Sequence, residues 1–301
     1  MDGKRQHYLP QFLLKGFKSE IEEKLSSNQI FAWHFHNNVS KTIHRDNIKT
    51  IGQKSQFYGN RTFTDLDIRI GKKEDIHSNQ IEELRKLNNN TELKNAKEIS
   101  ELAFFQFMRT RNYRLWLEKI HDAVPGAIIK GIKAVEVVEG VKKKFDMDMP
   151  LSFLEELYQK INGEDNESKK LSKNTHNSIL NKYLEDEDED EENETFEQFC
   201  NLNWYLIVFD KNSLILGDCG CYMKNDNGVT TWIKPKIIKE VFFPISHTHL
   251  IIGTNNEQLP ININVEEVNI GSCMCSKEFF VSSVNTEREN SYLNKYIGQQ
   301  E

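Results

Sequence analysis

The chain of 301 residues contains only five cysteines and six prolines, and it has no long apolar segment. So few cysteines do not make a disulfide scaffold, and a reducing compartment would keep them as thiols. No apolar run approaches the roughly 20 residues that are needed to cross a bilayer. The first residues, Met-Asp-Gly-Lys-Arg-Gln-His, lack the apolar stretch of a secretory signal. We therefore expect a cytoplasmic protein that has no contact with a membrane.

The chain also has no excess of basic residues, and its formal net charge is -7. The acidity is local: "EDEDEDEENE" at 185–194 carries nine acidic residues, and without their charge the chain would be at +2. Such a balance predicts neither a basic nucleic-acid-binding protein nor an acidic one. We interpret 162–195 as a mobile polar and acidic loop inside a single domain that spans 1–301.

Hydrophobic periodicity predicts the elements before this loop. Pro10 is expected to begin a short helix, "PQFLLKGF". The alternation in "NQIFAWHFHNNVSKTIHRDNIKT" predicts a β-hairpin with a two-residue turn at Asn37 and Asn38. Apolar residues three and four apart predict helices over 64–88 and 94–121, and a further helix is expected to start at Pro150.

The chain after the loop consists mainly of short β-branched and aromatic runs separated by turn residues. These runs are "WYLIVFD", "SLILGDCGCYM", "TTWIK", "EVFFPIS" and "HLIIGT". They predict antiparallel strands. Strands at both ends with helices between them indicate an α+β fold, with an N-terminal short helix and hairpin, a central helical segment and C-terminal, mainly antiparallel strands.

Two groups of residues resemble metal ligands. His34 and His36 share a face of the predicted hairpin, but a two-residue turn pairs residue 34 with 41 and puts His44 on the opposite face. Solvent-facing histidines are therefore favoured over a three-histidine site. Four thiolates suit tetrahedral zinc, although two CxC pairs lack the usual ligand spacing, and buried inert thiols are the favoured interpretation. These thiols are Cys219, Cys221, Cys273 and Cys275.

Gln106 and Arg109 stand one helical turn apart in "ISELAFFQFMRTRNYRLWL", which is apolar on nearly all sides. A buried amide or guanidinium without a partner costs a few kcal/mol. The partner is either another group of the protein or a ligand, since a planar guanidinium suits phosphate or carboxylate.

The opening "HYLPQFLLKGF" at 7–17 resembles the start of a widespread, mostly microbial family, a domain of unknown function. Its members open with a phrase close to His-Tyr-Val-Pro-Gln-Phe-Tyr-Leu-Arg-Asn-Phe, followed by a hairpin, a phrase ending in Phe-Tyr and a helix with Gln-x-x-Arg. This chain has "SQFYGN" at 55–60 and Gln106 with Arg109. Later phrases like Ser-Asp-Asn-Pro-Val and Phe-Pro-Leu-Ser-Pro are matched by "LILGDCGCYM" and "FFPISHTH", where Asp218 keeps the carboxylate but the amide and the proline are lost.

The resemblance implies no known activity, but it singles out one constellation. Its members are His7, Gln11, Gln106, Arg109 and Asp218. His7 or Asp218 would transfer protons as catalytic residues, while Gln11, Gln106 and Arg109 would bind substrate through a phosphate or a developing oxyanion.

Two functions stay open at this point. The first is a hydrolase acting on a phosphate-containing substrate, with nucleic acid as one candidate ligand. The alternative is a non-catalytic binding or protein-interaction module, in which the same residues form a buried polar network. No metal ligand is assigned, and the cofactor is unknown.

Overall fold

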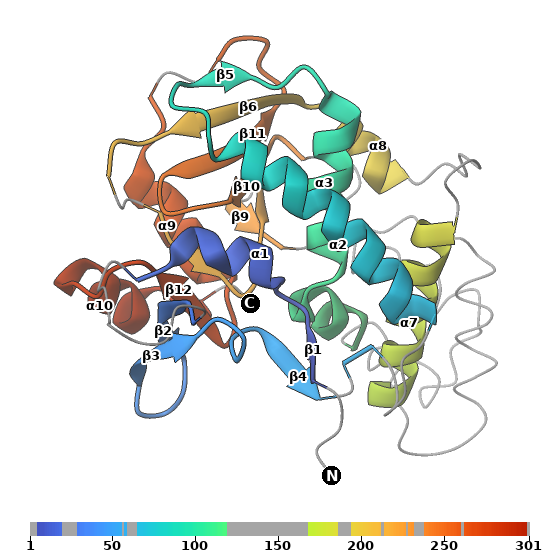
Figure 1. Ribbon diagram of the computed structural model, residues 1–301, viewed down its shortest axis with the longest axis horizontal. Coiled ribbons are helices and arrows are strands. Elements are labelled where there is room, and N and C mark those ends of the chain that lie inside the picture. Colours follow the sequence, from blue (N-terminus) through green and yellow to red (C-terminus); the bar gives the residue numbers. More distant parts are fainter. Residues whose placement is uncertain are drawn as a thin grey trace.

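Antiparallel sheets and helices make up the described part of the chain in a computed structural model (Figure 1). The structure describes residues 5–19, 29–55, 57–58, 65–118, 168–185, 194–211, 214–226, 228–231, 238–259 and 262–299. Strands near the N-terminus, then helices, then mostly strands confirm the predicted α+β class. The helix expected at Pro150 lies outside the described residues.

The larger sheet has six antiparallel strands, and it contains strands from the predicted runs "WYLIVFD", "EVFFPIS" and "HLIIGT" and from the end of "SLILGDCGCYM". Of the predicted run "TTWIK", only Thr230 lies in a strand, and residues 232–234 lie outside the described residues. In spatial order the strands are β5 (Thr91–Glu92), β6 (Asn203–Val208), β11 (His249–Thr254), β10 (Glu240–Pro244), β8 (Tyr222–Asn225) and β9 (Gly228–Thr230). Its central strand β11 is buried along its whole length. A strand that is buried on both faces reads as a continuous apolar run, as "HLIIGT" does.

The second sheet joins the N-terminal hairpin to the C-terminal part of the chain. Its order is β3 (Ile43–Asn47), β2 (Phe31–His36), β12 (Phe279–Ser282) and β7 (Leu216–Gly217). Phe35 stacks on Phe280 across the β2–β12 pair, with ring centroids 4.5 Å apart. Two further strands, β1 (Arg5–His7) and β4 (Gln53–Ser55), form a separate antiparallel pair.

The predicted two-residue hairpin turn was wrong. The amide of His36 donates to the carbonyl of Thr42, and the loop between them is held by the side chain of Asn38, which bonds the amide and hydroxyl of Thr42. Residue 34 therefore pairs with 44 instead of 41. A shift by an odd number of residues turns every side chain of a strand to the other face. His44 consequently lies on the same face as His34.

The predicted opening helix is confirmed as α1 (Gln11–Leu14) followed by the 3-10 turn η1 (Lys15–Phe17), with Pro10 just before the first helical residue. Figure 1 shows α1 between the two main sheets. The carbonyl of Gly16 accepts the amide of His247, which follows β10, while Ser19 donates to Phe31 of β2. A Cβ atom on Gly16 would lie 2.3 Å from the carbonyl oxygen of Ile245, so this close approach requires glycine.

The predicted helix over 64–88 is α2 (Asp65–Leu84). The segment 94–121 was predicted as continuous, but α3 (Ala96–Met108) stops before a second helical stretch at 111–118. The hydroxyl of Thr110 bonds the carbonyl of Phe107 and accepts the amide of Tyr113, which satisfies backbone groups at the break. The break lies next to Arg109, the C-cap residue of α3.

Part of the predicted 162–195 loop is helical, because 168–185 form α7 (Ser168–Glu185). His176 explains why this polar segment packs: it is fully enclosed, its Nδ1 accepts from Arg114 Nε at 3.1 Å, and its Nε2 donates to the carbonyl of Met108 at 2.7 Å. The composition of 162–195 is typical of linkers, so it did not indicate that His176 would be buried there.

The remaining helices are α8 (Glu194–Cys200), α9 (Val265–Cys275) and α10 (Glu287–Lys295). Among the helices that the structure describes, none has the length and apolar character that crossing a membrane would require.

Candidate functional site

Arg109 is the centre of the polar residues that the sequence singled out. Its side chain is 1% exposed, although it is charged. Nη1 lies 2.6 Å from Oε1 of Glu74 on α2, and Nη2 donates to the carbonyl oxygen of His7 at 2.7 Å. Burial lowers the pKa of Arg109, but its interactions with the carboxylate of Glu74 and with Tyr58 outweigh burial and hold that pKa above its usual value. The guanidinium is therefore always charged, and its partners belong to the chain itself.

The side chains of His7, the last residue of β1, and Gln11, the first residue of α1, lie close together. Gln11 Nε2 lies 3.1 Å from His7 Nε2, and both side chains are partly exposed. Burial and, more weakly, the charge of Arg109 lower the pKa of His7, whereas Glu74 acts in the opposite direction. The net result is a neutral imidazole at pH 7 at the rim of the Arg109 network.

Tyr58, Gln6 and Glu74, which the sequence did not single out, extend this network. The hydroxyl of Tyr58 donates to the backbone carbonyl of Arg109 at 3.0 Å, and the side chain of Gln6 accepts the amide of Tyr58 and donates to Asp67. Tyr58 belongs to the phrase "SQFYGN", so the resemblance offered a signal for it. No sequence signal distinguished Glu74, because it is one of many charged residues in α2.

Gln106 faces a different segment from Arg109. Its side chain is 2% exposed, and its Nε2 has no hydrogen-bond partner among the described residues. Gly220 approaches it so closely that a Cβ atom there would lie 2.6 Å from this nitrogen. Gly220 has φ +70°, a conformation that glycine adopts without strain. Gln106 thus links α3 to the turn that contains Asp218.

Asp218 is 1% exposed, and its carboxylate accepts hydrogen bonds from backbone amides. It accepts the amides of Lys277, Glu278 and Phe279 at 2.6–3.3 Å, which fixes the start of β12. Burial raises the pKa of Asp218 to about 7, although the amides of Lys277 and Phe279 lower it. The structure therefore brings His7, Gln11 and Arg109 into one connected network, with Gln106 on the same helix. Asp218 binds another part of the chain.

The four cysteines of the CxC pairs are all buried, and burial raises the pKa of each thiol, which disfavours thiolate ligands. Within the described residues, the metal-ligating side chains gather in one set of three only: His34, His36 and Asp46.

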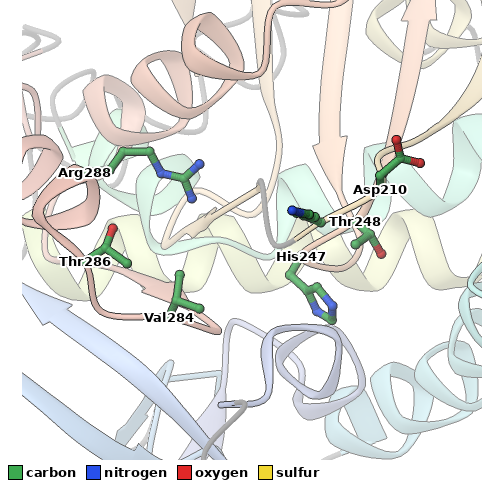
Figure 2. A pocket seen from close by; sticks show the side chains of 7 residues that line it. Asp210, His247, Thr248, Val284, Thr286 and Arg288 are labelled. Atoms are coloured by element: carbon green, nitrogen blue, oxygen red, sulfur yellow. The ribbon is translucent and has the colours of Figure 1, made fainter.

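An open basin of about 690 Å³ lies apart from these residues. It is lined by Asp210, Lys211, His247, Thr248, Val284, Thr286 and Arg288. Figure 2 shows Val284, Thr286 and Arg288 on one side and Asp210 and Thr248 opposite them. Sequence reasoning missed this basin, because its walls come from three segments that lie far apart in the sequence, 210–211, 247–248 and 284–288.

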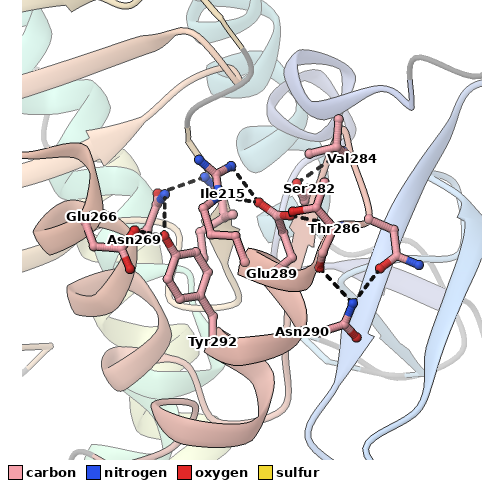
Figure 3. A network of polar contacts seen from close by, with 11 residues as sticks. Ile215, Glu266, Asn269, Ser282, Val284, Thr286, Glu289, Asn290 and Tyr292 are labelled. Carbon is pink, nitrogen blue, oxygen red and sulfur yellow. Dashed lines mark hydrogen bonds and ion pairs between the residues drawn. The ribbon is translucent and has the colours of Figure 1, made fainter.

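One wall of the basin is fixed by buried polar contacts at α10 (Figure 3). Glu289 is 0% exposed, and its Oε1 accepts from Nε and Nη2 of Arg288 at 2.8 and 2.6 Å. Its other oxygen accepts the amide of Thr286, as part of a capping box. On the same helix the hydroxyl of Tyr292 donates to Glu266. Arg288 therefore reaches the basin in a fixed orientation.

A sequence model described as "Protein of unknown function (DUF4238)" matches residues 5–295, nearly the whole chain. The chain belongs to the DUF4238 family. This confirms the resemblance to an uncharacterised family, and DUF4238 membership itself assigns no reaction. No curated protein and no solved structure matches the chain.

Proposed function

We propose that this DUF4238 protein is a non-catalytic binding module in which the Arg109 network is structural. The observation that carries the proposal is the enclosure of Arg109: the guanidinium is 1% exposed, and both terminal nitrogens lie against groups of the chain. A phosphate would have to displace Glu74 to reach it. The network instead docks the N-terminal segment on α2 and α3.

The ligand surface in this proposal is the basin of Figure 2. Five of its seven lining residues carry hydrogen-bond donors, and one carries a carboxylate. Donors of this kind, with Lys211 among them, suit an anionic ligand such as a phosphate-containing one, whereas Nε and Nη2 of Arg288 already bind Glu289. Because the basin is open and polar, it suits a ligand that lies across the surface better than an enclosed apolar molecule.

Thermal unfolding with ATP and inorganic tripolyphosphate as probes tests the basin. A ligand that binds only the native state raises the melting temperature. Both probes should raise it for the wild type, and Lys211→Glu should abolish the rise. Lys86→Glu is the matched control, because Lys86 is exposed outside the basin and makes the same change of charge. No rise with either probe in the wild type, or an equal loss in both variants, would exclude a specific phosphate site in the basin.

A hydrolase centred on His7 is the second candidate. It is favoured by two buried nitrogens without partners among the described residues, Nε2 of Gln106 and Nε of Arg109. Buried donors are normally satisfied, so a bound group near α3 would account for them. His7, neutral at pH 7 and partly exposed, would accept the proton of a water.

Cleavage of bis-p-nitrophenyl phosphate tests this second candidate. A hydrolase would lose its turnover in His7→Ala while keeping its melting temperature. Gln53→Ala, at the residue paired with His7 in β4, is the control for changes in the strand pair. Absence of turnover by the wild type, or equal turnover in all three proteins, would remove the catalytic interpretation.

A further inference from the structure

The corrected register of the β2–β3 hairpin places four polar side chains on one face. His34 pairs directly with His44, and His36 and Asp46 lie two residues further along their strands. In a strand, residues two apart point to the same face. The ring centroids of His34 and His36 are 3.6 Å apart, and those of His36 and His44 are 5.7 Å apart.

The side chains of His34 and His36 converge at Asp46. Its Oδ2 lies 2.8 Å from Nδ1 of His34 and 3.6 Å from Nε2 of His36. One ligand atom from each of the three residues lies within 4.8 Å of the others. Ligand atoms of a tetrahedral ion with bonds of about 2.0–2.1 Å stand about 3.3 Å apart. The two measured separations lie on either side of that value, so small side-chain rotations would bring the atoms to a metal.

Burial supports the same interpretation. His34 is 7% exposed, and its Nδ1 is the ring nitrogen that faces Asp46. Its ring and that of Phe279 on β12 pack edge to face, with centroids 4.6 Å apart. The side chains of His36 and Asp46 are 31% and 35% exposed, which leaves an approach from solvent. The site therefore combines one buried metal-ligating side chain, His34, with two that are accessible from solvent, His36 and Asp46.

We propose that His34, His36 and Asp46 bind one divalent transition-metal ion, with zinc as the best match, on the polar face of the β2–β3 hairpin. Two imidazoles and one carboxylate are borderline and hard donors, which suit zinc better than calcium or magnesium. Three protein ligands leave a further position, which is open to water or to His44, the exposed histidine beside His36. The site is separate from both the Arg109 network and the basin.

Zinc titration of the untagged protein by calorimetry tests the site. Wild type should bind one zinc ion per chain, and Asp46→Asn and His36→Ala should each weaken binding. Loss of an outer-shell partner alone costs about 10–100-fold in metal affinity, so loss of a direct ligand should cost more than about 100-fold. Asp226→Asn is the matched control, since it makes the same carboxylate-to-amide change at an exposed residue. It should bind zinc like the wild type.

Melting temperatures show whether the variants are folded, and zinc stoichiometry shows whether other side chains bind the metal. Zinc should raise the melting temperature of wild type and Asp226→Asn but not of Asp46→Asn, whose melting temperature without zinc shows that it is folded. Stoichiometric zinc retained by both Asp46→Asn and His36→Ala would place the metal elsewhere, for example on the cysteines, and would overturn the proposal. Absence of stoichiometric binding by the wild type would overturn it too.

Discussion

Nη1 of Arg109 lies 2.6 Å from Oε1 of Glu74 and joins α3 to α2 through an ion pair in which the arginine is 1% exposed and the glutamate 30%. The same guanidinium bonds the backbone of His7. A buried charge of this kind is stabilised by its partners, and breaking one partnership leaves the charge uncompensated.

Removing Glu74 should therefore destabilise the protein. Glu74→Ala leaves Arg109 without its carboxylate, and loss of one partner of a buried pair typically costs about 3–5 kcal/mol. The partial exposure of Glu74 places the expected value at the lower end. Urea unfolding measures it. The double variant Glu74→Leu/Arg109→Met should recover part of the loss, and strict additivity of the two single changes would contradict direct coupling.

Stability should depend on pH through His77. Its side chain is 2% exposed and packs against Phe105, and burial, followed by Lys73 and Arg109, lowers its pKa to about 3. Below pH 6.5 the unfolded chain binds a proton at this residue that the folded chain does not bind, so stability falls as the pH decreases from 6.5 towards 3.

His77→Leu should remove this contribution. Between pH 6 and 4 the free energy of unfolding of the variant should fall less steeply than that of the wild type, by up to about 1.4 kcal/mol per pH unit. Denaturant unfolding at several pH values gives both slopes. Parallel pH profiles for the two proteins would show that His77 does not stay neutral in the fold.

Asp218→Asn should weaken the start of β12. The carboxylate accepts three backbone amides, and an asparagine side chain would direct its own NH₂ towards some of them. Leaving buried donors unsatisfied costs about 1–3 kcal/mol. Faster hydrogen exchange at the amides of Lys277 to Phe279 would locate the effect. Unchanged stability and exchange would favour a functional role for Asp218 over a structural one.

Gln106 and Gly220 should be energetically coupled. Gly220→Ala places a methyl group against Gln106 Nε2 and forces alanine to a positive φ, a conformation that costs about 1–2 kcal/mol. Gln106→Ala removes the contact but not the backbone strain. The double variant should lose less stability than the sum of the single ones, by about 0.5–3 kcal/mol. Simple additivity would mean that the two residues do not touch.

The sequence predicted the elements better than their pairing. Runs such as "HLIIGT" were recognised as strands because a strand that is buried on both faces has apolar residues in succession instead of alternating with polar ones. The hairpin register was missed because Asn38 bonds Thr42 and lengthens the loop, a contact that alternation alone does not encode. That error separated His44 from His34.

The candidate residues were found because polar side chains in apolar segments must be satisfied, as Arg109 is. Their partners were not predictable, because Glu74 and the backbone of His7 are brought together by packing over long sequence separations. The helix α7 was missed for the same reason: His176 is buried by Arg114, which is 62 positions away.

Thermal unfolding of wild type and Arg109→Lys, each with and without ATP, tests the central claim most directly. If Arg109 is structural and phosphate binds in the basin, the variant should melt at a lower temperature, but ATP should raise both melting temperatures by the same amount. A rise in the wild type that disappears in Arg109→Lys would place the ligand at Arg109 and contradict the account.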